Sequence, residues 1–170
     1  MSIGRFRSTA AFSPRTRAPA VAVDRATFVI FSIGEHRFGV PVERAERVLR
    51  ADFALDSVTY SGRSLPLANL ASALGLVLVP SIRSRVLVVA YAQSWIAAAV
   101  DAVHEVATID ASMVAPLVYD GTPTYLPVGA RGIFMRQEQT VLVLDVARAL
   151  KATVHSGLLD FSDLVRGDVA

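Results

Sequence analysis

The side chains that commonly carry out catalysis or bind metals are few in this chain and form no familiar pattern. There is no cysteine, and the histidines are His36, His104 and His155. None of them has a second ligand at the spacing of a metal site such as HExxH. Asp101 and Glu105 are four residues apart and could act as paired carboxylates, but the start of a helix also favours acidic residues. We therefore predict a protein that is not an enzyme and has no metal or cofactor.

Nucleic-acid binding has equally weak support in the folded part of the chain. Small barrels bind single strands with basic grooves and stacking aromatics. Tyr91 and Trp95 have no arginine interleaved, so we expect them to be core residues. Residues 1–26 hold five arginines and one aspartate, while the rest of the chain holds twelve basic and fourteen acidic residues. We predict a disordered basic tail over 1–26, for which an arm binding acidic partners, including nucleic acid, and a transit peptide are alternatives.

Composition indicates a chain that can bury a sizeable core. It has 170 residues, of which 53% are apolar, and its mean hydropathy is +0.47. This is enough for one compact domain or for two small ones that pack closely together. No apolar run reaches the roughly 18 residues of a transmembrane helix, so we expect no direct membrane insertion.

Two pairs of segments repeat within the chain. Residues 28–48 (FVIFSIGEHRFGVPVERAERV) align without a gap with 86–106 (VLVVAYAQSWIAAAVDAVHEV), and each reads as a strand, a polar turn, a second strand and an acidic residue. Residues 64–74 (SLPLANLASAL) align with 140–150 (TVLVLDVARAL), and each reads as a strand, a capping Asn or Asp and a short helix. Duplicated β-units with only short helices predict an all-β fold of two small barrels packed together.

The stretch that follows each second strand is predicted to be helical. Ala45, Val48 and Leu49 lie at helical spacing and indicate one or two turns. Asp101 begins the equivalent turn in the second copy, which also contains His104.

The same stretches offer a possible binding surface. The repeat aligns three apolar residues of the first copy with three of the second: Val42, Ala45 and Val48 with Val100, Val103 and Val106. If the copies pack side by side, these equivalent edges would border a shallow apolar groove that accepts the apolar stripe of a helix. The alternative is that all six residues belong to the core.

Four segments, in this order along the chain, resemble the CheW family, the coupling proteins of bacterial chemotaxis arrays. They are FVIFSIGEHRFGVPVERAERVL, VTYSGRSLPLANLASALGL, RVLVVAYAQSWIAAAVDAVHEV and GIFMRQEQTVLVLDVARAL. The resemblance implies a CheW-like domain over 27–153, made of two packed SH3-like five-stranded β-barrels. Residues 154–170 would be a C-terminal tail with a possible short helix.

The resemblance also implies a function and partners. CheW-like proteins are non-catalytic cytoplasmic adaptors, associated with membrane receptor arrays. They couple the cytoplasmic hairpin of methyl-accepting chemoreceptors to the regulatory domain of a CheA-type histidine kinase. A divergent member that serves twitching or gliding motility is the alternative.

Site residues follow from the resemblance by motif position. The receptor-binding groove would be lined by Val29, Val42, Ala45, Val48 and Val103. The kinase-binding face would include Arg47, Tyr60, Ser61 and Gly62.

Three departures from the family pattern fall at the expected kinase face. Ser61 replaces the usual arginine, Arg47 occupies a position that is commonly acidic, and the connection over 51–61 is shorter than usual. We therefore expect receptor binding to be retained and the kinase contact to be weakened or re-specified.

Overall fold

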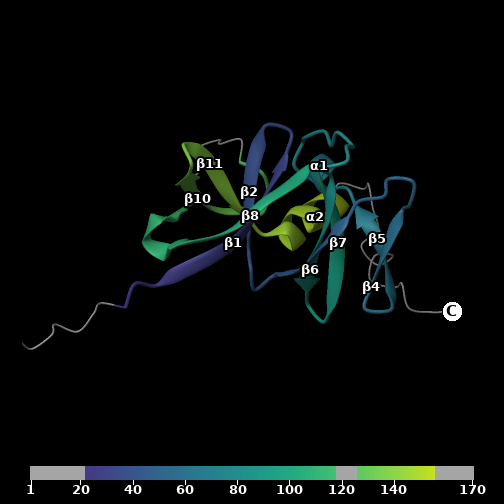
Figure 1. The fold of residues 1–170 in the computed structure, drawn as a ribbon, viewed down its shortest axis with the longest axis horizontal. Helices are drawn as coiled ribbons and strands as arrows, with labels where there is room; N and C mark the ends of the chain where they lie inside the picture. The colour runs from purple at the N-terminus through teal and green to yellow at the C-terminus, as the bar shows by residue number, and fades with distance from the viewer. Residues whose placement is uncertain (1–21, 118–125, 156–170) are drawn as a thin grey trace, which may run out of the picture.

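The fold consists of two curled β-sheets packed together, with a helix between them (Figure 1). It is seen in a computed structural model, which describes residues 22–117 and 126–155. The predicted all-β class with short helices is confirmed. No helix in these two ranges is long and apolar enough to cross a membrane.

One sheet has the strand order β8-β1-β2-β11-β10-β9, and the other has the order β3-β6-β7-β5-β4. The first is built from β1 (Arg25–Ile33), β2 (His36–Pro41), β8 (Ala102–Asp110), β9 (Ala115–Pro116), β10 (Ala130–Arg136) and β11 (Gln139–Leu144). The second is built from β3 (Ala45–Arg50), β4 (Ser57–Tyr60), β5 (Arg63–Ala68), β6 (Arg85–Tyr91) and β7 (Ser94–Val100). The helices are α1 (Leu70–Ala73), the 3₁₀ turn η1 (Ala111–Met113) and α2 (Val146–His155).

The two copies of the repeat exchange their third strands. After the β1–β2 hairpin, β3 crosses to the other sheet and pairs with β6, while β8 crosses back and pairs with β1. Val48 lies opposite Leu87, and Val106 lies opposite Val29. Val48 and Val106 are 58 residues apart, and so are Val29 and Leu87, which is the spacing of the sequence repeat. The copies are therefore related by an approximate twofold, and neither completes a sheet alone.

The second pair of repeats obeys the same symmetry. β5 pairs in parallel with β7, and β11 pairs in parallel with β2. The side chain of Asn69 accepts a hydrogen bond from the backbone N–H of Ser72 (3.0 Å) at the start of α1. Asp145 accepts one from the N–H of Arg148 (3.0 Å) at the start of α2. Both predicted helix caps are thus confirmed.

The helical turns predicted after each second strand are wrong, because both stretches are strands that carry a β-bulge. In β3 the register shifts between Ala45 and Arg47, which leaves Glu46 without a partner in β6. In β8 the equivalent shift leaves His104 without a partner in β1. The extra residue of a bulge brings positions three apart, such as Ala45 and Val48, to the same face of the strand. A bulged strand therefore imitates the spacing of a helix. Asp101 lies in the bend between β7 and β8.

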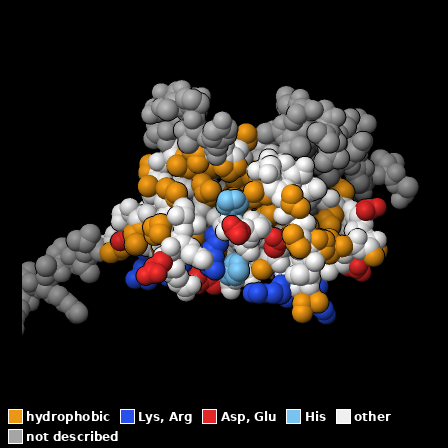
Figure 2. Space-filling model, turned by 90° about the horizontal axis from the view of Figure 1, so that it is seen from above, with side chains coloured by type: hydrophobic (Ala, Val, Ile, Leu, Met, Phe, Trp, Pro, Cys, Tyr) orange, Lys and Arg blue, Asp and Glu red, His pale blue; other side chains and the backbone are white. Residues whose placement is uncertain are grey.

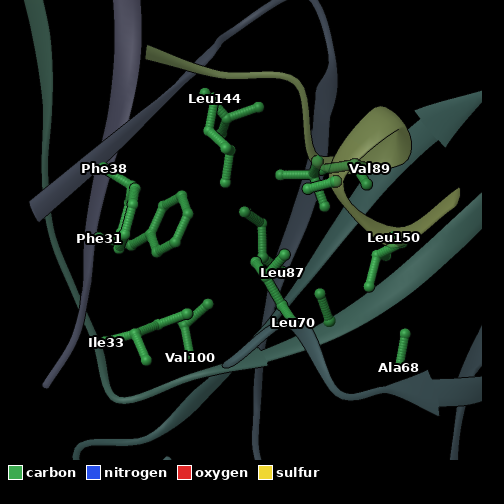
Figure 3. Packing of buried hydrophobic residues seen from close by; sticks show 14 of the residues in the cluster. Phe31, Ile33, Phe38, Ala68, Leu70, Leu87, Val89, Val100, Leu144 and Leu150 are labelled. Atoms are coloured by element: carbon green, nitrogen blue, oxygen red, sulfur yellow. The ribbon is translucent and has the colours of Figure 1, made fainter. Parts of the chain in front are cut away.

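Buried side chains form three clusters, one within each curled sheet and a larger one between the sheets. We call the last the central cluster; it includes Phe31, Phe38, Leu87, Val89, Val100 and Leu144 (Figure 3). Alternate residues of β1 enter different clusters: Phe28 points into its own sheet, and Val29 points into the central cluster. A strand buried on both faces is the arrangement predicted from its continuous apolar run.

The central cluster should dominate stability. We predict that Leu87→Ala, at a fully buried position between the sheets, lowers the free energy of unfolding by about 2–5 kcal/mol. Leu55→Ala, at an exposed position, should change it by less than about 0.5 kcal/mol. Urea denaturation of both variants measures the difference. Equal effects would show that the packing between the sheets is not the main source of stability.

Candidate functional site

The structure gathers most of the predicted groove residues around the central cluster. We call Val42, Ala45, Val48, Val103 and Val106 the apolar seam. Directly opposite residues of an antiparallel pair share one face of a sheet. Val106 therefore lies on the same face of the sheet as Val29. Val29 is buried (5% exposed), whereas Val106 reaches the surface (61% exposed). At the symmetric position, Val48 (39% exposed) lies on the same face as the buried Leu87.

The other members of the seam lie where the chain crosses between the sheets. Ala45 and Val103 are half-buried and pack against the central cluster. Val42 is exposed in the crossover from β2 to β3, where its N–H donates to the carbonyl of Thr27 (2.9 Å). Val106 is absent from the set implied by the resemblance, although the repeat aligns it with Val48. Figure 2 shows hydrophobic side chains gathered beside the histidines on one face of the molecule.

Asp101 and Glu105 are not a carboxylate pair, because each has a structural partner of its own. Asp101 accepts hydrogen bonds from the backbone N–H groups of Gly34 (2.6 Å) and Val79 (3.1 Å). Glu105 forms two hydrogen bonds with the guanidinium of Arg136 (3.0 and 3.2 Å). The hydrogen bond from Arg136 holds the pKa of Glu105 below its ordinary value. These carboxylates tie segments together and leave no acid–base pair.

The three histidines belong to three different elements. His36 is exposed at the start of β2, and His155 is the last residue of α2. The ring of His104 forms a hydrogen bond with the hydroxyl of Ser32 (2.9 Å). Burial lowers the pKa of His104, as do the charges of Arg37 and Arg83. Within the described ranges, no three His, Asp or Glu residues are grouped so that they could hold a metal ion.

The residues predicted for the kinase face lie on the two terminal strands of one curled sheet. Tyr60, Ser61 and Gly62 lie in the β4–β5 hairpin, and Arg47 lies on β3. Ser61 (φ 49°) and Gly62 (φ 75°) have the left-handed conformation of a two-residue hairpin turn.

Trp95, expected in the core, packs against the cluster inside the second sheet, and an arginine that is distant in the sequence also lies beside its ring. Its ring packs edge-to-face on Tyr60, with centroids 5.1 Å apart, and the guanidinium of Arg63 lies 5.8 Å from its centroid. Trp95 is only half-buried. The pairing of β4 with β5, which places Arg63 opposite Tyr60, is the signal that would have indicated the contact of both residues with Trp95.

A pocket of about 450 Å³ lies between the first turns of α2 and the ends of β2 and β6. None of the predicted site residues lines it. We call it the basic pocket, because its lining includes four cationic side chains and a single carboxylate: Arg44, Arg131, Arg148, Lys151 and Asp145. The ammonium of Lys151 lies 4.8 Å from the ring centroid of Tyr91, another residue expected in the core.

Asp145 connects the basic pocket to the cap of α2. Its carboxylate accepts a hydrogen bond from Arg131 (2.6 Å) as well as from the N–H of Arg148. Burial alone would raise the pKa of Asp145, but these hydrogen bonds and the nearby charges of Arg131 and Arg44 outweigh it and hold the pKa below its ordinary value. The carboxylate therefore stabilises the folded state when it is ionised.

Comparisons with known proteins agree with this geometry. The crystal structure of the scaffolding protein TtCheW from Thermoanaerobacter tengcongensis superposes with a TM-score of 0.63 and 20% sequence identity, covering 72% of this chain and 85% of that one. The fold is thus that of a double-barrel domain. A family model of the CheW-like domain matches residues 27–154, and the chain therefore belongs to the CheW-like domain family. A search of curated protein sequences found no match.

The charge of Asp145 should make stability depend on pH. A carboxylate with a lowered pKa contributes stability above the unfolded value of about 3.9, and this contribution is lost as the pH falls through the folded pKa. Asp145→Asn should keep the helix cap, as Asn69 does, but lose the ion pair. We predict that the variant is less stable than the unmodified protein at pH 7 and that the difference shrinks toward pH 3, as followed by urea denaturation.

The symmetric position provides the control. Asn69→Asp places a carboxylate at the start of α1, where Leu55 occupies the position equivalent to Arg131. This variant should show little of the pH-dependent gain. A pH-independent effect of Asp145→Asn would mean that only the cap matters.

Proposed function

We propose that this protein is a non-catalytic, cytoplasmic adaptor of a bacterial chemosensory array. In this role it couples the cytoplasmic tips of chemoreceptors to a CheA-type histidine kinase. The observation that supports the proposal is the apolar seam, which leaves Val48 and Val106 exposed at equivalent positions in a member of the CheW-like family. An α-helical hairpin with an apolar stripe has the matching chemistry.

The seam is suited to modest, reversible association. Burial of apolar surface contributes about 25 cal/mol per Å² removed from water, and ordering of the partners offsets part of this gain. Two of the five seam residues, Ala45 and Val103, already pack on the central cluster, so these two need little ordering on binding.

Val106→Asp tests the receptor surface. A charge at this exposed position should weaken binding of a soluble receptor hairpin at least about tenfold, equivalent to 1.4 kcal/mol, as measured by isothermal titration calorimetry. Val103 also belongs to the predicted groove, but its side chain packs on the central cluster, so Val103→Asp would lower stability as well.

The matched control is Ile82→Asp, a similar change at a 93% exposed residue outside the seam. Its affinity should equal that of the unmodified protein. Equal affinities for Val106→Asp and Ile82→Asp, in proteins with unchanged amide spectra, would contradict a receptor site at the seam.

We also propose that the kinase contact is weakened or re-specified. The β4–β5 turn presents the uncharged Ser61, and the neighbouring Arg63 lies over the ring of Trp95. Restoring the arginine typical of the family would supply a cation at the turn itself.

Titration with the regulatory domain of the cognate kinase tests this second proposal. Ser61→Arg should bind more tightly than the unmodified protein. Gln137→Arg is the matched control, because Gln137 (φ 48°) occupies the same turn position in the β10–β11 hairpin. Ordinary micromolar affinity of the unmodified protein would defeat the proposal, and a gain from Gln137→Arg alone would move the contact to the other hairpin.

A further inference from the structure

The basic pocket has the size of a site for a small molecule. Its volume of about 450 Å³ falls within the range of roughly 300–1,000 Å³ that is typical of ligand pockets. The half-buried Tyr91 lines it. Its other apolar lining comes from the ends of three strands and the start of α2: Val40, Pro41, Val89, Val143 and Val146. The pocket therefore offers one occupant both an apolar wall and charged groups.

The charge of the lining is not balanced within the part of the chain that the structure describes. Its single carboxylate, Asp145, accepts hydrogen bonds from the guanidinium of Arg131 (2.6 Å) and from the backbone N–H of Arg148 (3.0 Å). The side chains of Arg44, Arg148 and Lys151 form no ion pair with a described carboxylate. Four cations against one carboxylate leave an excess of three positive charges. Such a concave, basic surface attracts anions.

The fold does not require these cations. The pairing of β11 with β2 and the cap of α2 recur as the pairing of β5 with β7 and the cap of α1. At the positions equivalent to the four cations, however, no residue is charged. Ala102 is equivalent to Arg44, Leu55 to Arg131, Ser72 to Arg148 and Gly75 to Lys151. The same local structure forms without the charges, so their gathering in one pocket points to a ligand.

We propose that the basic pocket binds a soluble organic molecule that carries a phosphate or diphosphate group. Guanidinium groups match phosphate oxygens with paired hydrogen bonds, and an ammonium adds a point charge. A phosphate monoester carries about −1.5 to −2 charges at pH 7. One or two phosphates would thus balance the lining, which a single carboxylate would not. No residue of the apolar seam lines the pocket, so the site is independent of the adaptor function.

The cations of the pocket divide into two roles. Arg131 is held by Asp145, and the same carboxylate caps α2, so this ion pair fixes one wall of the pocket. We assign contact with the phosphate to Arg44, Arg148 and Lys151, which have no such partner among the described residues.

The apolar wall favours an organic phosphate over the inorganic ion. The ammonium of Lys151 lies 4.8 Å from the ring centroid of Tyr91, so a cation and an aromatic face border the same space. An ammonium has three N–H donors, and contact with the ring leaves donors for a phosphate. Aromatic rings also pack well on flat organic groups. ADP has both parts, a diphosphate and a flat base, and is therefore a suitable probe.

Titration of the ¹⁵N-labelled full-length protein tests the inference. ADP should shift the amide signals of Ala92, Ala147 and Arg148, which line the pocket, and leave that of Val106 in the apolar seam unchanged. Pyrophosphate should cause similar shifts only at higher concentration, because it cannot contact the apolar wall. Adenosine, which has no phosphate, should cause none.

Three results of this titration would overturn the proposal. Equal responses to adenosine and ADP would show that the cations are not the determinant. Pyrophosphate binding as tightly as ADP would show that an inorganic anion suffices. No response to either phosphate compound would leave the pocket without this ligand.

Substitutions taken from the other copy separate binding from folding. Arg44→Ala with Arg148→Ser installs the residues found at the equivalent positions. We expect this double variant to keep its amide spectrum outside the pocket and to raise the dissociation constant for ADP at least about tenfold, equivalent to 1.4 kcal/mol. Arg47→Ala with Arg50→Ser removes two charges from exposed residues outside the pocket and should leave the affinity unchanged. Equal losses would indicate general attraction of anions and contradict a specific site.

Two further titrations distinguish other sources of negative charge. Vesicles of phosphatidylglycerol present phosphates on a membrane surface, and the regulatory domain of the kinase presents carboxylates on a protein. Vesicle binding that requires Arg44 and Arg148, without a response to ADP, would assign the pocket to lipid headgroups. Kinase binding with the same requirement, again without a response to ADP, would make the pocket a protein contact. Either result would overturn the proposal of a soluble ligand.

Discussion

The exchange of third strands between the two copies is the constraint on which the rest of the structure depends. β3 completes the sheet of β6 and β7, and β8 completes the sheet of β1 and β2. Because each crossover connects the two sheets, their apolar faces pack together. The side chains of these faces form the central cluster, which a single copy would leave exposed. The seam is a direct consequence, because Val48 and Val106 lie on the exchanged strands at the edges of that cluster.

The duplication was predictable from the sequence because the register of paired strands follows their apolar pattern. Identical spacings in both copies therefore produced identical pairings, down to the caps at Asn69 and Asp145. The bulges were not predictable in the same way. Ala45 and Val48 are three residues apart and face one cluster, which a regular strand cannot arrange but a helix or a bulged strand can. Only the pairing with β6 distinguishes the two, and that pairing is made by a distant segment.

The site was predictable to a smaller extent. The resemblance indicated Val42, Val48 and Val103 of the seam, and the repeat added Val106, because all four belong to the duplicated unit itself. The basic pocket draws its lining from four separate segments, including the end of β2, the end of β6 and the start of α2. Arg44 and Lys151 are more than a hundred residues apart, and nothing in their local sequence marks them as neighbours. The contact between Arg63 and Trp95 likewise arises from the alignment of two strands.

Comparison of equivalent positions in the two copies distinguishes residues that the fold requires from residues that can vary without changing the fold. Ser61 and Gln137 share a left-handed turn conformation, and Asn69 and Asp145 share a capping role, so both copies meet the same local demand with different side chains. Where geometry is common, the differences in chemistry are not needed for folding. The uncharged Ser61, equivalent to Gln137, and Lys151, equivalent to the Gly75 that ends α1, are differences of this kind. They alter one hairpin and the end of one helix, and in each case the symmetric partner serves as an internal reference.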